Sequence, residues 1–163
     1  MADCRADDQQ TGPESAPAKS EVYVAPFSHL DLYWGSTQEE CLSRGNRIIM
    51  KAIGLAEKHP DFRFLLEDDV FVNNFVESRR GTLELEKFRQ FVKQGRIEIA
   101  PKCAAIYQNL PRAEALVRNL VYGKRFARDV FGVDPQVAHL GDIPGFTGNI
   151  RRCLRNPRFP SWS

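Results

Sequence analysis

The fold is decided by the stretch DFRFLLEDDVFVNNFVESRRGTLELEKFRQFVKQGRIEIAP (residues 61–101). Near its start lies FRFLLE (62–67), an apolar, β-favouring run that predicts a buried strand. At its end lies RIEIA (96–100), a second such run, and Pro101 stops it because proline cannot donate a ladder hydrogen bond. The stretch therefore contains two predicted strands of one sheet.

The segment between these two strands predicts two helices. Val70–Ser78 is a short helical stretch that Gly81 breaks. Thr82 can cap a second helix, and Gly95 follows its end. Apolar residues recur along that second helix at helical spacing: Leu85, Phe88, Phe91 and Val92. Two strands joined through helices indicate a βα unit, in which the strands run parallel.

The same alternation continues on both sides of the stretch. Val22–Ala25 predicts an earlier buried strand, and Thr37 can cap a helix that runs to Lys58. A long helix is expected from Pro111 to Gly132, and Gln136–Gly141 is a fourth predicted strand. The expected class is therefore α/β, with four parallel strands and their helices. A complete eight-unit barrel is excluded, because it takes ~250 residues and the chain has 163.

Charge divides the chain into three zones. Residues 1–20 carry a net charge of −2 and no large apolar residue after Met1, so we expect a disordered tail. Residues 21–147 have no net charge, which argues against a nucleic-acid partner. Residues 148–163 form a basic tail of net charge +4. No apolar run approaches the ~20 residues of a membrane span, and no signal peptide is visible. We therefore expect a cytoplasmic protein with no membrane partner.

The four cysteines are not in C-x-x-C spacing, so a zinc ribbon or redox motif is not indicated. Without a secretion signal we expect free thiols. Of the three histidines, His59 stands at a helix end, and His139 is expected within the fourth strand as a core residue.

Polar residues follow the predicted strands at the edge where sites form in βα sheets. His29 and Asp31 follow the first strand, and they point the same way because residues two apart share a face of extended chain. An imidazole and a carboxylate there could bind Zn²⁺, with Asp142 after the fourth strand as a third ligand. The residues alone leave other interpretations open: a hydrogen-bonded loop pair for His29 and Asp31, and a plain turn at Asp142.

Two further features at this edge also have alternative interpretations. Glu67, Asp68 and Asp69 end the second strand and could act as acid or base, bind a cation, or simply cap the following helix. Trp34 could be a platform for a sugar ring or a lid on the core. Tyr107-Gln108-Asn109 follows the third strand.

Two motifs resemble the α-mannosidases of glycoside hydrolase family 38, in their bacterial type. VYVAPFSHLDLYW (22–34) resembles the opening motif of the family, and FGVDPQVAHLGDIPGFT (131–147) resembles its nucleophile segment. The resemblance covers about residues 21–147. It implies that these residues form part of the family's N-terminal catalytic domain, the first half of a seven-stranded (β/α) barrel.

The resemblance also implies a zinc-dependent, retaining hydrolysis of α-mannosides in carbohydrate metabolism. His29 and Asp31 match two zinc ligands of the family. Asp142 matches the aspartate that both contacts zinc and acts as nucleophile, and Trp34 matches the aromatic residue of the sugar subsite. The expected substrate is an α-mannoside or a mannose-containing oligosaccharide.

The chain departs from the family pattern in places. Phe27 and Phe146 stand where histidine is common, and Cys103 where tryptophan is common. The family's fourth zinc ligand and its acid/base carboxylate have no counterpart here. We therefore expect a truncated domain that is weakly active or inactive alone, with open sheet edges that permit self-association. The alternatives are a non-catalytic remnant or interaction fragment, and a zinc polysaccharide deacetylase, which would need no nucleophile.

Overall fold

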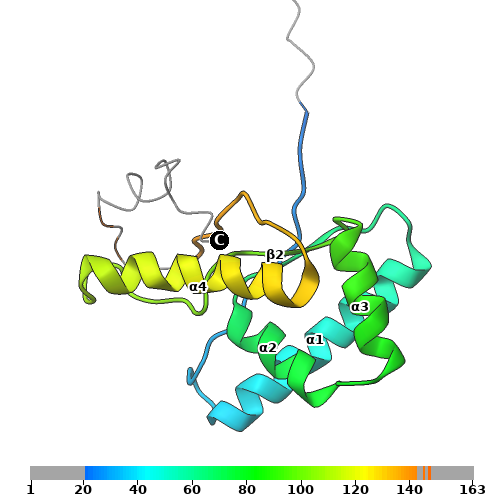
Figure 1. Cartoon of the computed structure of the whole chain (residues 1–163), viewed down its shortest axis with the longest axis horizontal. Coiled ribbons are helices and arrows are strands. Elements are labelled where there is room, and N and C mark those ends of the chain that lie inside the picture. The colour runs from blue at the N-terminus through cyan, green and yellow to red at the C-terminus, as the bar shows by residue number, and fades with distance from the viewer. Residues whose placement is uncertain (1–20, 143–144, 146, 148–163) are drawn as a thin grey trace, which may run out of the picture.

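The computed structural model describes residues 21–142, 145 and 147. The predicted tails, 1–20 and 148–163, lie outside the described residues. Helices and strands alternate as α1 (Gln38–Lys58), β1 (Phe64–Leu66), α2 (Asp69–Ser78), α3 (Leu83–Lys93), β2 (Ile97–Ile99) and α4 (Ala113–Phe131) (Figure 1). None of the helices in this part of the chain is both long and apolar enough to cross a membrane.

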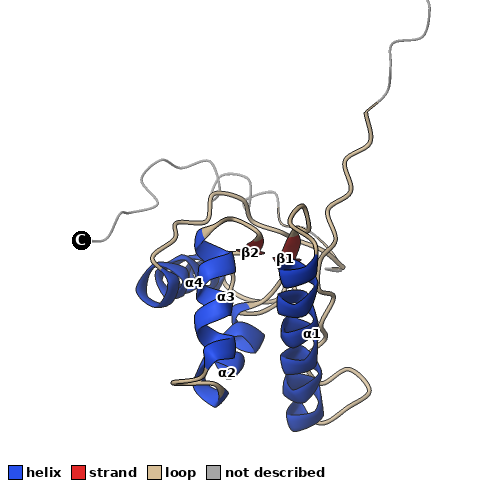
Figure 2. Ribbon diagram, turned by 90° about the vertical axis from the view of Figure 1, so that its right-hand side faces the viewer, coloured by secondary structure: helices blue, strands red, loops and turns tan. Residues whose placement is uncertain are grey.

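The two strands of the decisive stretch pair in parallel, as predicted. Phe64, Leu65 and Leu66 stand opposite Ile97, Glu98 and Ile99. Figure 2 shows the short strands above the helices. The mixed helix and parallel-strand architecture confirms an α/β protein, although the described strands are only three residues each. The described residues form a two-stranded sheet, so the half barrel with four strands is not confirmed.

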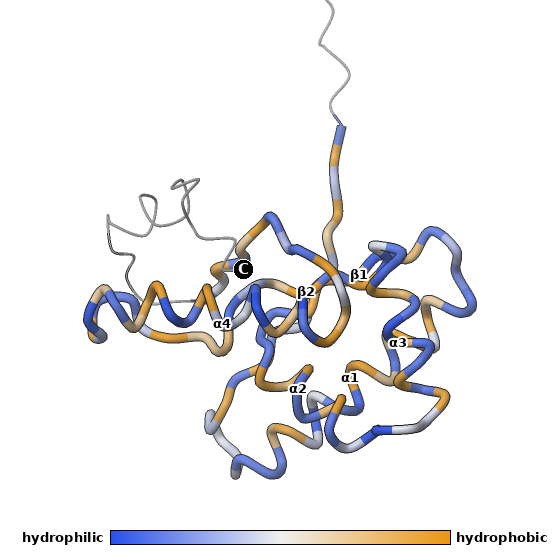
Figure 3. The backbone as a smooth tube through the Cα atoms, in the orientation of Figure 1, coloured by the Kyte–Doolittle hydropathy of each residue, from blue (hydrophilic) through white to orange (hydrophobic). Residues whose placement is uncertain are grey.

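The first predicted strand was placed wrongly. Val22, Tyr23 and Val24 are exposed, in an extended segment whose apolar residues stand away from the body (Figure 3). The chain joins the sheet further on, where Phe27 forms a parallel bridge with Leu65. In that register residues 22–25 would run beside residues 60–63, which begin in a turn and offer no strand to pair with.

Around that bridge, Leu65 N donates to Pro26 O (3.0 Å) and Ser28 N donates to Leu65 O (2.8 Å). The segment 26–28 therefore lies on the opposite side of β1 from β2.

The fourth predicted strand, Gln136–Gly141, is also wrong. These residues form no strand. The ring of His139 lies 4.6 Å from the ring of Phe27, centroid to centroid, so this segment reaches the first chain segment instead of pairing with β2. His139 is consequently not a core residue of a strand, and a quarter of its side chain is exposed.

The helix boundaries follow the local signals closely. At the start of α1, Glu40 N donates to Thr37 Oγ1 (3.3 Å) and Thr37 N donates to Glu40 Oε2 (2.9 Å), a reciprocal capping box. Leu85 N donates to Thr82 Oγ1 at the start of α3. Gly132 ends α4 with φ 70°, a left-handed conformation that favours glycine.

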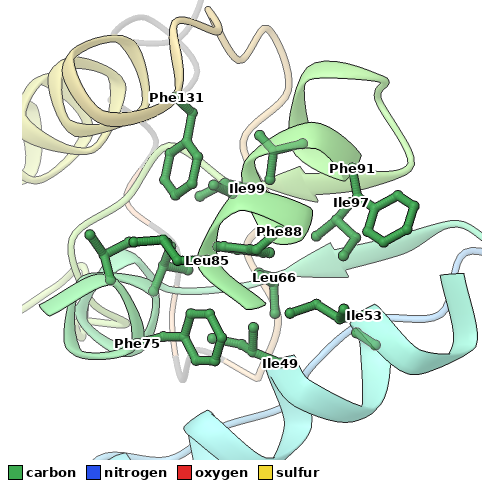
Figure 4. Close-up of a cluster of buried hydrophobic side chains, with 14 of the residues drawn as sticks. Ile49, Ile53, Leu66, Phe75, Leu85, Phe88, Phe91, Ile97, Ile99 and Phe131 are labelled. Atoms are coloured by element: carbon green, nitrogen blue, oxygen red, sulfur yellow. The ribbon is translucent and has the colours of Figure 1, made fainter. Parts of the chain in front are cut away.

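The core lies between the strands and all four helices. Figure 4 shows Ile49 of α1, Phe75 of α2, Phe88 of α3 and Phe131 of α4 within one cluster. Phe88 contacts both Phe75 and Phe131 edge to face, with ring centroids 5.3 Å apart in each pair. This cluster holds the helices against the strands and so places the residues that follow each strand at a common edge.

Candidate functional site

The carboxyl ends of the three paired chain segments carry the polar residues of the candidate site. His29 follows the segment that bridges to β1, Glu67 follows β1 directly, and Lys102 follows β2. Asp142 arrives from the segment after α4. Because the three segments run parallel, their carboxyl ends meet at one edge.

One ring nitrogen of His29 faces both of the carboxylates that the sequence pattern singled out. Its Nε2 lies 3.3 Å from Asp142 Oδ2 and 4.0 Å from Asp31 Oδ2. All three side chains are accessible, with 45% of His29, 46% of Asp31 and 78% of Asp142 exposed. The structure therefore brings the three residues together at a surface that a ligand can reach.

This set of donors fits zinc in its chemistry. One imidazole nitrogen and two carboxylates are ligands that zinc takes, and two ligands of a tetrahedral zinc stand about 3.3 Å apart. The distance between His29 Nε2 and Asp142 Oδ2 meets that value, whereas Asp31 is farther away. Within the described part of the chain, no group of three His, Cys, Asp or Glu side chains is already arranged to hold a metal ion.

Beneath His29 lies a buried set of charges. Glu67, Asp68 and Lys102 are each at most 3% exposed. Lys102 Nζ lies 3.2 Å from Glu67 Oε1, to which it donates a hydrogen bond, and 3.3 Å from Asp68 Oδ1. A buried charge needs a partner, and the one ammonium group here serves two carboxylates.

Burial changes the proton affinity of the two aspartates. It raises the pKa of Asp68 to about 6, against the opposing charge of Lys102. It raises the pKa of Asp69 to about 8, and the neighbouring Asp68 carboxylate adds to this increase. Asp69 is therefore largely protonated at neutral pH. The capping interpretation of these two aspartates is wrong, because Asp68 stands at the N-cap of α2 without a side-chain capping bond and both are buried.

The two cysteines within the described residues are free, as expected. Cys41 is buried in the smaller core cluster. Burial raises the pKa of the Cys103 thiol to about 11, with the charges of Asp69 and Asp68 adding to the effect. Cys103 is therefore a thiol rather than a reactive thiolate at neutral pH.

A pocket of about 340 Å³ opens beside His29. Its lining includes Asp31, Trp34, Asp68, Tyr107 and Asp142. Trp34 is 77% exposed, so it is not a lid on the core. The volume lies within the range of small-molecule sites.

Two residues of this pocket have left-handed backbone conformations. Tyr33 has φ 71° and Asp142 has φ 42°. Aspartate tolerates this region, but for a bulky residue such as tyrosine it is strained. Strain of this kind is found mainly where a site requires a particular geometry.

Sequence reasoning missed Lys102 and the depth at which Glu67 lies. A signal for Lys102 was present, because it stands three residues after the end of β2, near the carboxyl end of a predicted strand. Gly123 of α4 was also missed: a Cβ there would meet the Lys102 backbone nitrogen and, at 2.8 Å, Asp69 Oδ2. This close approach of α4 holds the buried charges in place, and only the packing of helix on strand reveals it.

The protein-family model described as "Glycosyl hydrolases family 38 N-terminal domain" matches residues 19–158. A search of curated proteins finds no match.

Two solved structures from Enterococcus faecalis share the fold. An alpha-mannosidase from strain V583 matches with a TM-score of 0.72 at 23% sequence identity. The match covers 80% of this chain and 15% of the mannosidase chain. A protein in the glycosyl hydrolase family 38 matches with a TM-score of 0.66 at 23% sequence identity. The match covers 81% of this chain and 15% of that protein's chain. The chain thus spans about 15% of the length of these proteins.

Proposed function

The chain belongs to glycoside hydrolase family 38, and from that membership we propose that it supplies part of the active site of a zinc-dependent, retaining α-mannosidase. The substrate class is an α-mannoside or a mannose-containing oligosaccharide. His29 and Asp31 are proposed zinc ligands, Asp142 a ligand and the nucleophile, and Trp34 a wall of the sugar subsite.

One observation carries this proposal. The Nε2 atom of His29 faces Asp142 at 3.3 Å and Asp31 at 4.0 Å, and both carboxylates line the pocket that contains Trp34. Two carboxylates of the kind that zinc takes therefore border a space that can admit a sugar, and the imidazole of His29 faces both of them. An exposed indole face beside that space is suited to packing against the apolar face of a pyranose ring.

Asp142 is suited to act as the nucleophile. Its carboxylate is exposed and its backbone lies at the pocket wall, so an oxygen can approach the anomeric carbon of a bound mannoside. The carboxylate oxygen forms an ester bond to that carbon, and the glycosidic oxygen departs with the bonding electron pair. Zinc, when bound, would hold sugar oxygens and fix the carboxylate. A second carboxyl group would protonate the leaving oxygen, and we assign none of this chain's residues to that role.

The test compares two substrates with the complete 163-residue chain, with and without zinc. A dinitrophenyl α-mannoside has a leaving group that needs no proton, whereas a mannose disaccharide does need one. Proton donation by a general acid accelerates such a reaction by ~10²–10⁴-fold. We therefore expect zinc-dependent cleavage of the aryl mannoside and none of the disaccharide. A mannosyl ester on Asp142, detected by mass spectrometry, would identify the nucleophile directly.

Asp142→Asn should abolish both the cleavage and the ester, because an amide is a poor nucleophile. Asp61→Asn is the matched control, an exposed aspartate in the turn before β1. Failure of the aryl mannoside to react with zinc present, or equal rates in wild type and Asp142→Asn, would contradict the proposal.

Two other functions would give different results in the same assays. A non-catalytic interaction fragment would bind no zinc and cleave neither mannoside, and the 4.0 Å gap between His29 and Asp31 favours it as the second candidate. A zinc deacetylase would release acetate from an acetylated sugar and would form no ester on Asp142. A cytoplasmic location and self-association through open sheet edges remain predictions.

A further inference from the structure

Glu67 lies directly behind the histidine of the proposed metal site. Its side chain is 2% exposed, and its Oε2 lies 3.5 Å from His29 Nδ1. The other ring nitrogen of His29, Nε2, faces Asp142 and Asp31. The imidazole therefore stands between a buried carboxylate on one side and the two exposed carboxylates on the other.

The backbone holds Glu67 and His29 in this arrangement. Glu67 N donates to the Oγ of Ser28 (3.0 Å), and Ser28 N donates to Leu65 O (2.8 Å). These bonds tie the residue before His29 to the residues around Glu67, across the bridge between the first segment and β1. The backbones of Glu67 and His29 are therefore held close to each other.

The two oxygens of Glu67 have different surroundings. Oε1 accepts a hydrogen bond from the buried Lys102 Nζ at 3.2 Å. Oε2 is buried and has no hydrogen-bond partner among the described residues. A buried carboxylate oxygen without a partner is costly, and the His29 Nδ1 atom facing it can supply the missing donor if it carries the proton.

We propose that Glu67 is a positioning residue for His29: it accepts the Nδ1 proton, so that the Nε2 lone pair points toward Asp31 and Asp142. The inference rests on the proposed function only in naming zinc as the ion that this lone pair would bind. A carboxylate behind a ligating histidine fixes its tautomer and ring orientation. Lys102 supplies the positive charge that allows the Glu67 carboxylate to be buried.

The Lys102 contact makes Glu67→Gln an informative substitution. Lys102 Nζ is a donor only, so the carbonyl oxygen of the glutamine should occupy the Oε1 position. The amide nitrogen then takes the Oε2 position and donates toward His29 Nδ1. The imidazole must accept there, which moves its proton to Nε2 and blocks the metal-binding lone pair. A shape-conserving change is thereby expected to reverse the tautomer.

The first measurement is zinc binding by isothermal titration with the full chain. Loss of such a supporting carboxylate costs ~10–100-fold in metal affinity, and we expect a weakening of that size in Glu67→Gln. Glu98→Gln on β2 is the control for the same chemical change, because Glu98 is exposed. His29→Ala should remove the binding altogether.

The second measurement is the tautomer of His29 in the zinc-free chain, by two-dimensional NMR of ¹⁵N-labelled histidine at mildly alkaline pH, where imidazole is ordinarily neutral. The chain has three histidines, and His29→Ala identifies the signal. Because the Asp142 carboxylate also faces Nε2, at 3.3 Å, the comparison is made in the Asp142→Asn background, whose amide can donate to an Nε2 lone pair. In that background the chain and its Glu98→Gln variant should carry the proton on Nδ1, and the Glu67→Gln variant should carry it on Nε2. If Glu67 had only a structural role, Glu67→Gln would lower the midpoint of thermal unfolding without changing the tautomer of His29.

The outcomes separate the inference from the proposed function. A proton on Nε2 in the Asp142→Asn chain overturns the inference, and this substitution should not disturb folding because the Asp142 side chain is 78% exposed. Equal zinc affinity in wild type and Glu67→Gln also overturns it. If wild type binds no zinc but the Asp142→Asn chain holds the Nδ1 tautomer, which Glu67→Gln reverses, the positioning role stands and the proposed zinc function fails.

Discussion

Asp69 is a buried aspartate whose surroundings disfavour the charged form of its carboxyl group. Its carboxyl group is 4% exposed, and neither oxygen has a hydrogen-bond partner among the described residues. Burial is the main reason that its pKa rises to about 8, and the Asp68 charge is the second. An unfolded aspartate has a pKa near 3.9.

The folded chain therefore binds more protons than the unfolded chain between about pH 4 and pH 8. Stability is expected to fall as the pH rises through this range, because unfolding then releases a proton that the folded state holds. The raised pKa of Asp68, about 6, adds a smaller loss of the same sign at the lower end of the range.

We predict that Asp69→Asn removes most of this pH dependence. The amide is neutral at every pH and resembles the protonated acid in shape. At the upper end of the range we expect a gain of about 1–3 kcal/mol in the free energy of unfolding, given that one pKa unit is worth about 1.4 kcal/mol. Urea unfolding between pH 4 and 8 measures it. Asp61→Asn, an exposed control, should leave the slope unchanged; the same slope in Asp69→Asn would refute the explanation.

At the scale of elements, the approach of α4 to the end of β2 is set by Gly123. An added Cβ would lie 2.5 Å from the Pro101 carbonyl carbon and 2.8 Å from Asp69 Oδ2. Neither neighbour can move freely, since one is backbone and the other is packed in the core. A glycine in a helix costs about 1 kcal/mol in propensity, so its presence here indicates a packing requirement.

We predict that Gly123→Ala destabilises the protein by about 1–3 kcal/mol, because overpacking at this contact outweighs the better helix propensity of alanine. Gly54→Ala on α1 is the matched control: nothing lies within 4 Å of its added Cβ, and a gain of about 0.5–1 kcal/mol is expected. Thermal or urea unfolding of both variants tests this. Stabilisation by both substitutions would show that α4 shifts without cost.

At the scale of the whole molecule, one aromatic ring links three helices. Phe88 of α3 is fully buried and contacts Phe75 of α2 and Phe131 of α4. α2 begins shortly after β1 ends, and α4 is the next helix after β2. The position of the site edge therefore depends on this contact.

We predict that Phe88→Ala lowers the free energy of unfolding by about 3–5 kcal/mol, the usual cost of removing a buried phenylalanine side chain. Leu83→Ala on the same helix should change it by less than about 0.5 kcal/mol, because Leu83 is exposed. Urea unfolding compares them. A loss below about 1 kcal/mol in Phe88→Ala would mean that the three helices do not depend on one another.

The sequence by itself determined the helices, their ends and the central βα unit. Thr37, Thr82 and Gly132 act through bonds or backbone angles within a few residues, so their effects can be predicted locally. The position of His29 at the edge also followed from sequence order, because it comes after the segment that pairs with β1. Asp142 reaches the same edge although residues 136–141 form no strand, so the reason that the sequence offered for its position was wrong.

Only the tertiary structure decided which extended segments became strands and which charges were buried. Val22–Ala25 has strand-like residues but no neighbour at its register, whereas Phe27 has Leu65. The sequence places Lys102 and Glu67 near strand ends but does not show that either charge is buried, whereas the packing of α4 and the strand ends closes over both. Strand pairing and charge burial depend on partners distant in sequence, and so no local pattern encodes them.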